Sequence, residues 1–456
     1  MSELPEGWTR VPLRNLLAQI EAGKSFGCEP RPAELDEWGI IKVSAMTWGK
    51  FLEHENKAVP AGREIDPRHE IQPGDILVSR ANTAEYVGAP VLVGNCRKGL
   101  LLSDKSLRLI PAEGVDKQWL TYALSSPTVR QHITKLSTGT KESMRNISQA
   151  KLLSIEVPKP PLKDQHRLVA TLDYLLSRVD AGMAYLESCD ASVDTLHRHV
   201  FARTSPSSVP AHWDVRRLDE IAEVRLGRQR SPKNHTGSSM RPYLRAANVG
   251  WQGLKLGDVM EMNFTNAEVE VFRLQRGDLL LSEASGSVGE VGKPAMWNDE
   301  IEDCCFQNTL LRVRAFGINP LYLFRFLYGE ALNGRFGSAA QGVNIHHLGA
   351  ARLSAWQVPV PPYHEQEHIA TQISEDLAGL GRLQDAIRLS KKRADTLRRS
   401  LLSAAFSGLL FCGSSAPSDG PVDELLDQSA GAEVIPFPID KPGDHGDALG
   451  VQEVLL

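Results

Sequence analysis

The sequence predicts an α+β protein in which two similar mixed α/β domains are separated by two long antiparallel helices, with pseudo-twofold symmetry. Three observations lead to this fold class: an internal duplication, a segment typical of a small sheet in each copy, and a long amphipathic stripe at the end of each copy. The chain has 456 residues. At roughly 150 residues per domain, this length also favours several structural units over one core.

The duplication consists of three segments that recur in the same order, each shifted by 201 to 205 residues. A short repeat of about 20 to 50 residues would indicate a solenoid, but this spacing indicates two copies of a whole domain. The paired segments are LPEGWTRVPLRNLL at 4–17 with VPAHWDVRRLDEIA at 209–222, PGDILVSRAN at 73–82 with RGDLLLSEAS at 276–285, and SIEVPKPPLKDQHRLVATL at 154–172 with AWQVPVPPYHEQEHIATQI at 355–373.

The first part of each copy is predicted to be a mixed domain built around a sheet. Short β-branched runs such as IIKVSAM, DILVSR and LRLIP alternate with Gly, Pro and Asn turns. We assign residues 1–160 to the first such domain and residues 204–361 to the second.

A long helix is predicted over 161–203, where apolar residues recur at steps near three and four from Leu168 to Val200. It begins after Pro160 and Pro161, because proline is tolerated only at a helix entrance. At about 1.5 Å per residue, a helix over 162–200 is roughly 58 Å long, which is more than one domain core requires.

The second copy ends in a similar helix over 362–411, whose apolar stripe runs from Ile369 to Leu401 and stops at Gly408. Two long stripes in one chain bury each other most simply as an antiparallel coiled-coil pair. The alternative, in which each helix lies on its own domain, remains open from the sequence.

The last segment, residues 412–456, differs from the rest in charge. Residues 413–456 contain nine Asp or Glu and the single Lys441, a net charge of −8, so the rest of the chain carries +3. We expect a disordered acidic tail on a mildly basic folded part. No apolar run is long enough to cross a membrane and the first residues lack a signal core, so a cytoplasmic protein without membrane contact is expected.

Candidate catalytic motifs fail on the chemistry of their residues. AGKS at 22–25 resembles the end of a phosphate-binding loop, but Ala18 stands where that loop needs glycine. VPPY at 360–363 resembles the tetrapeptide of adenine methyltransferases, yet Val360 cannot hydrogen-bond a flipped base. No nucleophile, base and orienting group recur together, and no metal site is predicted. The sequence therefore favours a binding protein over an enzyme.

A run without acidic residues extends from Val224 to Leu256 in the second copy. A solvated surface normally mixes both signs of charge, whereas arginine and asparagine among small polar residues suit phosphates and base edges. We interpret the run as a nucleic-acid contact, with a plain solvated face as the alternative. Its seven cations are Arg225, Arg228, Arg230, Lys233, Arg241, Arg245 and Lys255, and the first copy has a sparser set that includes Lys141 and Arg145.

The repeated plan as a whole resembles a known family. A tryptophan motif, GDILVSR, a Gly- and Thr-rich stretch before NIS, then VPKPPLKDQ and a long helix are similar to the specificity subunit of type I restriction-modification systems, over about residues 4–411. The resemblance implies two target-recognition domains that read a bipartite sequence in double-stranded DNA. It implies a non-catalytic subunit that directs two modification (methyltransferase) subunits, and a restriction subunit where one exists, to that target.

Cofactors follow from the same resemblance. It implies that S-adenosylmethionine, ATP and Mg are bound by the partner subunits and that this chain binds none of them. The alternative function is an autonomous two-headed DNA-binding protein without methyltransferase partners. A fused restriction-methylation enzyme is disfavoured, because no cofactor or nuclease motif is present.

Residues for DNA contact are carried over by position in the family plan. They lie in the loop after the first strand, at the end of the GDILVSR strand, and in the segments 137–148 and 339–348 that precede the last strand. Two further arginines come from the run without acids. The predicted DNA-binding residues are Lys24, Ser25, Arg80, Asn82, Lys141, Arg145, Arg228, Arg230, Lys233, Arg241, Arg245, Glu283, Ser285, Asn344 and His346.

Overall fold

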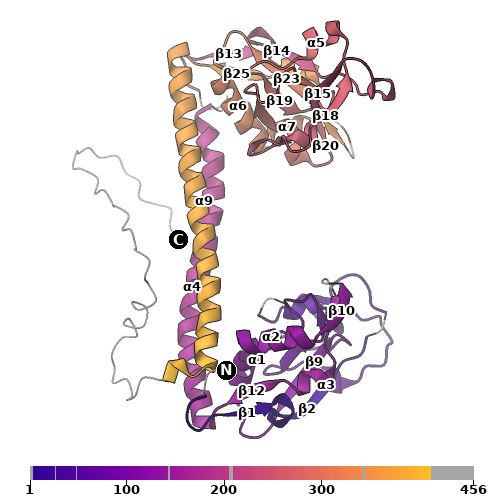
Figure 1. Cartoon of the computed structure of the whole chain (residues 1–456), viewed down its shortest axis with the longest axis vertical. Coiled ribbons are helices and arrows are strands. Elements are labelled where there is room, and N and C mark those ends of the chain that lie inside the picture. Colours follow the sequence, from indigo (N-terminus) through magenta and orange to yellow (C-terminus); the bar gives the residue numbers. More distant parts are fainter. Residues whose placement is uncertain are drawn as a thin grey trace, which may run out of the picture.

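The computed structural model describes residues 4–25, 27–47, 49–141, 144–204, 209–340, 342 and 345–411. Two mixed heads lie at opposite ends of a pair of long helices and project from the same side of it (Figure 1). We call residues 4–160 the first head, 209–361 the second head, and the two long helices the rod. The predicted fold class is confirmed. The predicted acidic tail at 412–456 lies outside the described residues.

The first head contains a four-stranded antiparallel sheet and three smaller sheets. The helices Lys117–Ser125 and Pro127–Leu136 contact the rod. The four-stranded sheet has the order β2 (Leu17–Ala22), β9 (Ser106–Pro111), β5 (Ile76–Ser79) and β7 (Pro90–Leu92). The smaller sheets are β4 (Asn56–Ala58), β3 (Gly39–Ile41) and β8 (Leu100–Leu101); β10 (Thr138–Lys141), β11 (Met144–Asn146) and β6 (Ala81–Asn82); and β1 (Thr9–Pro12) with β12 (Glu156–Lys159). The helices are α1 (Lys117–Ser125), α2 (Pro127–Leu136) and α3 (Gln149–Leu153).

The second head repeats this plan, with an extra helix, α5 (Asn266–Phe272), between two of its strands. Its four-stranded sheet has the order β14 (Ala222–Leu226), β23 (Leu310–Ala315), β19 (Leu279–Ser282) and β21 (Pro294–Met296). The smaller sheets are β18 (Met260–Asn263), β15 (Met240–Leu244) and β22 (Cys305–Phe306); β16 (Val249–Gly250) with β17 (Gly253–Leu254); β20 (Ala284–Ser285) with β24 (His346–His347); and β13 (Asp214–Arg217) with β25 (Gln357–Val360). The remaining helices are α6 (Pro320–Leu332), α7 (Arg335–Ala339) and α8 (Ala350–Ser354).

The rod consists of α4 (Leu162–His199) and α9 (Tyr363–Phe406). Each begins directly after a proline pair, as predicted, and α9 ends two residues before Gly408, whose φ of +82° is readily adopted only by glycine. At 1.5 Å per residue the two helices are about 57 and 66 Å long. The helices are antiparallel, because Asp180 pairs with Arg398 while Asp190, further along α4, pairs with Lys391 at 2.7 Å.

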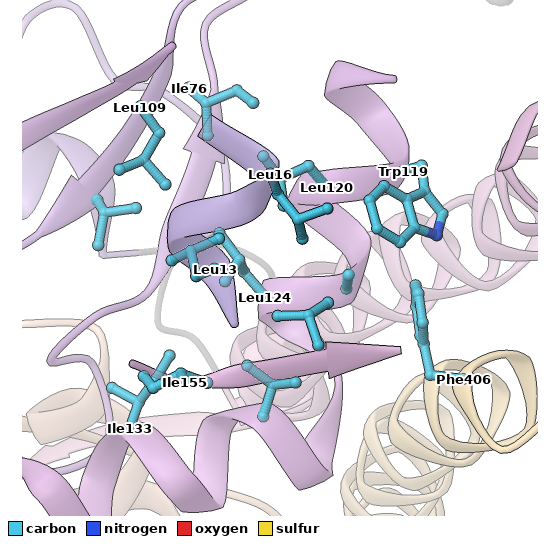
Figure 2. Packing of buried hydrophobic residues seen from close by; sticks show 14 of the residues in the cluster. Leu13, Leu16, Ile76, Leu109, Trp119, Leu120, Leu124, Ile133, Ile155 and Phe406 are labelled. Atoms are coloured by element: carbon cyan, nitrogen blue, oxygen red, sulfur yellow. The ribbon is translucent and has the colours of Figure 1, made fainter. Parts of the chain in front are cut away.

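The end of α9 completes the core of the first head (Figure 2). Phe406 lies against Trp119 of α1, with ring centroids 6.5 Å apart, and Leu402 joins the same cluster. At the other end of the rod, Phe201, which follows α4, packs against Tyr328 of the second head. Each rod end therefore contains residues from both repeats, which excludes the alternative that each helix lies on its own domain alone.

The apolar stripes are only partly covered by this pairing. Leu196, Leu383 and Leu397 belong to the predicted stripes but remain 52%, 46% and 37% exposed. The antiparallel pair therefore leaves these positions of the stripes open to solvent.

A buried glutamine fixes each long helix to its own head. Gln165 accepts a hydrogen bond from the backbone N–H of Asp116 at 2.9 Å and donates to the carbonyl of Pro160 at 3.0 Å. Gln366 makes the equivalent contacts with the N–H of Asn319 and the carbonyl of Pro361, both at 2.8 Å. This explains why the glutamine recurs in the KDQ and HEQ segments of the duplication.

Candidate nucleic-acid interface

The two heads carry an equivalent small sheet on the edges that face each other along the rod (Figure 1). In the first head, β6 pairs with β11 so that Asn82 lies opposite Arg145. In the second head, β20 pairs with β24 so that Ser285 lies opposite His346. The structure thus brings together the strand end and the later segment that the sequence analysis assigned to DNA contact.

Backbone pairing holds Arg80 in place at the end of β5 in the first head. Its N–H donates to the carbonyl of Lys105 at 2.8 Å, and its own carbonyl accepts from the N–H of Ile147 at 3.0 Å. The side chain is exposed and has no partner among the residues that the structure describes. Arg80 therefore combines a fixed backbone with an available guanidinium.

The other predicted residues on this small sheet are partly occupied. Asn82 accepts from the N–H of Thr83 at 2.8 Å, and its amide nitrogen lies 3.4 Å from the hydroxyl of Thr47. Arg145 donates to the carbonyl of Gly139 at 3.3 Å. The side chain of Lys141 lies outside the described residues.

Lys24 and Ser25 follow β2 and are exposed. The hydroxyl of Ser25 donates to the carboxylate of Asp104 at 2.5 Å. These two residues lie next to the strand β8 and the turn after it, not on the small sheet, so they form a second part of the candidate surface.

Arg228, the counterpart of Lys24, does not point outward as expected. Its guanidinium donates to Glu268 at 2.7 Å and to the carbonyl of Asn263 at 2.6 Å, and it lies 4.8 Å from the centre of the Phe264 ring. Its side chain is only 11% exposed. The contacts occupy the charge within the second head, so the expectation that Arg228 is available to DNA is contradicted by its position.

Several other arginines of the run without acids are paired with acids from outside it. Arg225 bonds Glu223 at 2.6 Å and Arg245 bonds Asp258. Arg241 lies 3.7 Å from Asp303. The run therefore does not form one uncompensated basic patch, because acids next to it in sequence or in space balance most of its charge.

Two predicted cations of this run remain exposed on the loop after β14. The Nε of Arg230 donates to the imidazole of His235 at 3.2 Å, and Lys233 has no partner within the described part of the chain. Among the predicted DNA-binding cations of the second head, these two have no acidic partner in the described residues.

Glu283 occupies the position of Arg80 in the second head and contacts a residue that sequence reasoning missed. Its carboxylate lies 3.1 Å from the Nδ1 atom of His347, the neighbour of His346 on β24. The hydroxyl of Ser285 accepts from the N–H of Ser287 at 3.1 Å. Asn344 lies outside the described residues. The alternation of side chains along a strand was the signal that could have singled out His347.

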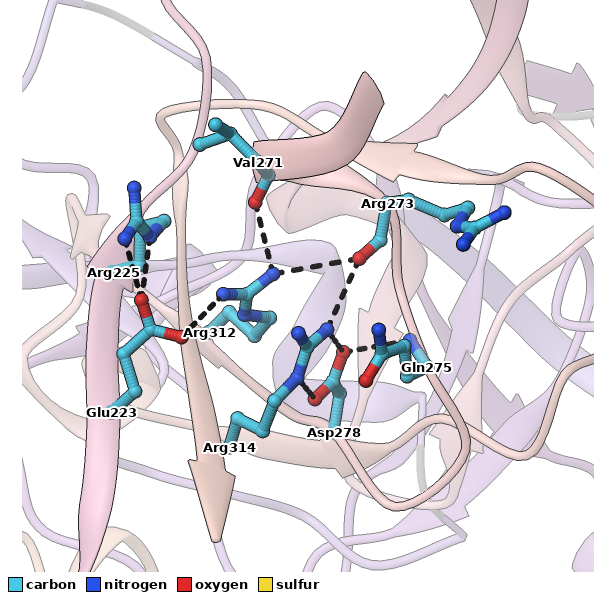
Figure 3. Close-up of polar contacts among 8 residues, drawn as sticks. All are labelled: Glu223, Arg225, Val271, Arg273, Gln275, Asp278, Arg312 and Arg314. Atoms are coloured by element: carbon cyan, nitrogen blue, oxygen red, sulfur yellow. Dashed lines mark hydrogen bonds and ion pairs between the residues drawn. The ribbon is translucent and has the colours of Figure 1, made fainter. Parts of the chain in front are cut away.

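A buried arginine network supports the sheet behind these surfaces (Figure 3). Arg312 bonds Glu223 at 2.8 Å and Arg314 bonds Asp278 at 2.7 Å. Burial lowers the pKa of Arg312, whereas the hydrogen bond to Asp278 raises the pKa of Arg314. In the first head, Arg108 contacts Glu21 and Asp75 in the same way. These arginines hold strands together and do not belong to the candidate interface.

The described residues contain no group of three or more His, Cys, Asp or Glu side chains that could hold a metal ion. Within the same part of the chain, no helix is both long and apolar enough to cross a membrane.

Known proteins to which the chain is similar include type I restriction-modification specificity domains and subunits. Residues 210–380 match the model of the type I restriction modification DNA specificity domain. The chain is 23% identical over 429 residues to the EcoKI specificity subunit of Escherichia coli strain K12, and the match covers 90% of both proteins. It is 30% identical over 188 residues to the EcoEI specificity subunit of Escherichia coli, a match that covers 41% of this chain and about a third, 32%, of that protein.

Solved structures share the fold. A chain from a structure described as the basis of complex assembly and conformational transition of the type I R-M system superimposes with a TM-score of 0.67 at 18% identity, covering 89% of this chain and 98% of the other. The HsdS subunit from Thermoanaerobacter tengcongensis gives a TM-score of 0.54 at 20% identity with the same coverage. The duplicated heads and the rod are therefore common to these chains.

Proposed function

Because the chain belongs to the family of type I restriction-modification specificity subunits, we propose that it reads a bipartite, asymmetric target in double-stranded DNA. Each head would read one half of the target, and the rod would fix the unread gap between the halves. The observation that carries this proposal is the pair of equivalent small sheets, which present different side chains on facing edges of the two heads.

The half-sites are proposed to differ in sequence. At equivalent positions the first head has Arg80, which is exposed, and the second has Glu283, whose side chain is 14% exposed and contacts His347. Arginine favours the acceptor atoms of guanine, whereas a carboxylate accepts from the amino group of cytosine. Two heads of one fold would therefore select different base pairs.

Partners and cofactors are also part of the proposal. Specificity subunits are non-catalytic, so chemistry at the target would come from other chains. We propose two modification subunits, and a restriction subunit where the system has one, with S-adenosylmethionine, ATP and Mg bound by those partners. The exposed apolar residues of the rod support contact with other chains, since exposed apolar side chains gathered on one element often mark interfaces.

The test is a methylation map. The chain is purified with the products of neighbouring genes, and methylated adenines are located by single-molecule sequencing. We expect two short, different half-sites separated by a constant gap. Exchange of residues 209–355 with those of a relative should change one half-site only, and the matched exchange in the first head should change the other.

Two outcomes would contradict the proposal. A single continuous palindrome would be incompatible with two different heads. A map unchanged by either exchange would show that the heads do not set the target. DNA binding by the chain without any methyltransferase neighbour would instead support the autonomous DNA-binding alternative.

A further inference from the structure

A cavity of about 490 Å³ opens on the first head beside strands β3 and β4. Two apolar residues of β3, Ile40 and Ile41, which are 5% and 2% exposed, are among the residues that line it. Three lysines line it: Lys42, Lys57 and Lys105. Three ammonium groups in one lining are suited to an anionic ligand.

Most of the positive charge at this cavity is uncompensated. Lys42 lies 3.4 Å from Glu55, but Lys57 and Lys105 have no acidic partner among the residues that the structure describes. The one carboxylate in the lining, Asp104, accepts a hydrogen bond from Ser25 at 2.5 Å. The lining therefore carries a net positive charge.

Cys28 also lines the cavity, and nearby cations affect the pKa of its thiol. Burial raises the pKa of its thiol, while Lys57 and Arg63 act in the opposite direction. Because Cys28 and Lys57 both line the cavity, the thiol supplies a chemical reporter there.

The cavity adjoins the candidate interface. The carbonyl of Lys105 accepts a hydrogen bond from the N–H of Arg80 at 2.8 Å. This bond fixes the rim of the cavity next to Arg80, at the end of β5. A ligand that lies along the small sheet of the first head would therefore pass next to Lys105, one of the two uncompensated lysines of the cavity.

The second head has different residues at the equivalent positions. Thr309 takes the place of Lys105, and its hydroxyl accepts from the N–H of Ala246 at 3.0 Å. Met260 takes the place of Lys57, and Arg245, in the place of Lys42, is paired with Asp258. The uncompensated lysines are therefore a property of the first head.

We propose that this cavity of the first head binds a backbone phosphate of the DNA strand that borders its half-site, with Lys57 and Lys105 as the gripping residues. The proposal rests on the proposed function, because it assumes DNA as the ligand of the heads. Lysine is a point charge that suits phosphate, whereas planar base edges favour arginine, asparagine and glutamine.

The first test measures the salt dependence of binding by the full chain to a mixed-sequence DNA duplex. Each phosphate contact adds about 0.9 to the slope of log affinity against log salt concentration. Because both lysines hold the same phosphate, the double variant Lys57→Ala and Lys105→Ala should lose about 0.9 from the slope. The control is Lys50→Ala with Lys98→Ala, two exposed lysines of the same head that do not line the cavity.

The second test uses the unmodified chain and does not depend on any variant folding. Alkylation of Cys28 by iodoacetamide is followed by peptide mass spectrometry with and without the duplex. We expect DNA to slow modification of Cys28 several-fold and to leave Cys96, a half-buried cysteine elsewhere in the same head, unchanged. In a third measurement, inorganic phosphate at matched ionic strength replaces the duplex, and alkylation of Cys28 is followed in the same way.

The outcomes separate this proposal from the proposed function. Equal slopes for the cavity and control variants, or equal modification of Cys28 with and without DNA, would overturn the cavity assignment while DNA binding and the methylation map stood. Protection by inorganic phosphate alone would assign the cavity to a free anion and also overturn it. Absence of any DNA binding would refute the proposed function itself.

Discussion

At the scale of single residues, arginines of the second head differ mainly in what surrounds them in space. Arg228 is enclosed by Glu268 and Phe264, whereas Arg230, two positions later, is exposed. A sequence window shows both as cations in the same basic run. Only the structure separates a cation that stabilises the head from one that can meet a phosphate.

Arg228→Ala should therefore lower stability. The change removes the donor to Oε1 of Glu268 and to the carbonyl of Asn263, while the bonds from Thr265 to the other oxygen of Glu268 remain. Hydrogen bonds to charged groups contribute about 1.5 to 3 kcal/mol, so we expect the free energy of unfolding in urea to fall by about 2 kcal/mol. The salt slope of DNA binding should stay nearly constant.

Arg230→Ala is the matched control, and it should affect DNA binding and leave stability nearly unchanged. An exposed substitution should change the free energy of unfolding by less than about 0.5 kcal/mol and reduce the salt slope by about 1. If Arg228→Ala left the free energy of unfolding unchanged and instead reduced the salt slope of DNA binding, the structural role given to Arg228 would be wrong.

The ion pair between Arg228 and Glu268 also makes the stability of the protein depend on pH. Burial alone would raise the pKa of Glu268, but hydrogen bonds from Thr265 and Arg228 outweigh it and hold the pKa below its usual value. A carboxyl with a lowered pKa in the folded state stabilises the protein above its unfolded pKa of about 4.3, and this contribution is lost as the pH falls through the folded pKa.

Glu268→Gln should thus be less stable than the unchanged protein at neutral pH, and the difference should shrink below about pH 4. Urea unfolding of both proteins at a series of pH values measures this difference in the free energy of unfolding. Glu261→Gln, at an exposed position of the same head, should show no such trend. A difference that stayed constant as the pH fell would argue against the ion pair as its cause.

At the scale of elements, the junction between head and rod depends on one side chain in each repeat. Gln366→Leu would leave the N–H of Asn319 and the carbonyl of Pro361 buried without partners. We expect a loss of about 2 to 3 kcal/mol in the free energy of unfolding, since each unsatisfied group costs about 1 kcal/mol or more. Gln384→Leu, on the same helix without a hydrogen-bond partner in the described part, is the control; an equal loss in both would contradict the junction role.

The rod gives a second prediction at this scale. Leu175→Pro removes a helical hydrogen bond and introduces a clash, so helix stability should fall by about 3 kcal/mol or more. Circular dichroism should show reduced helicity, and co-purification with the modification subunits should fail. Lys163→Pro, in the first turn of α4 where proline is tolerated, is the matched control.

Local patterns predicted the elements well where each residue acts through its neighbours in sequence. The prolines before each long helix, the apolar stripes and the β-branched runs fixed the helices and the main strands. Contacts between distant segments were missed: the acids that balance Arg245 and Arg241, the buried glutamines of the junctions, and the pairing of Glu283 with His347. Their partners are set by the folded topology, which a sequence window does not contain.

At the scale of the whole molecule, the rod length should set the unread gap of the target. Insertion of one heptad into both α4 and α9 keeps the apolar stripes in register and adds about 10 Å between the heads. We expect a methylation map with both half-sites unchanged and a longer gap. Insertion into one helix alone should break the pairing and abolish methylation. An unchanged gap in the double insertion would show that the rod is not the spacer.

The contact of Phe406 with Trp119 also bears on how the molecule is made. A ribosome releases the first head long before it has synthesised the helix that completes that head's core. Until then the nascent chain carries an open apolar surface around Trp119, the kind of surface that holdase chaperones cover and that promotes aggregation when left bare. The two halves of the gene product therefore mature together, at the end of translation, and a prematurely terminated chain would be left with neither a closed first head nor a rod.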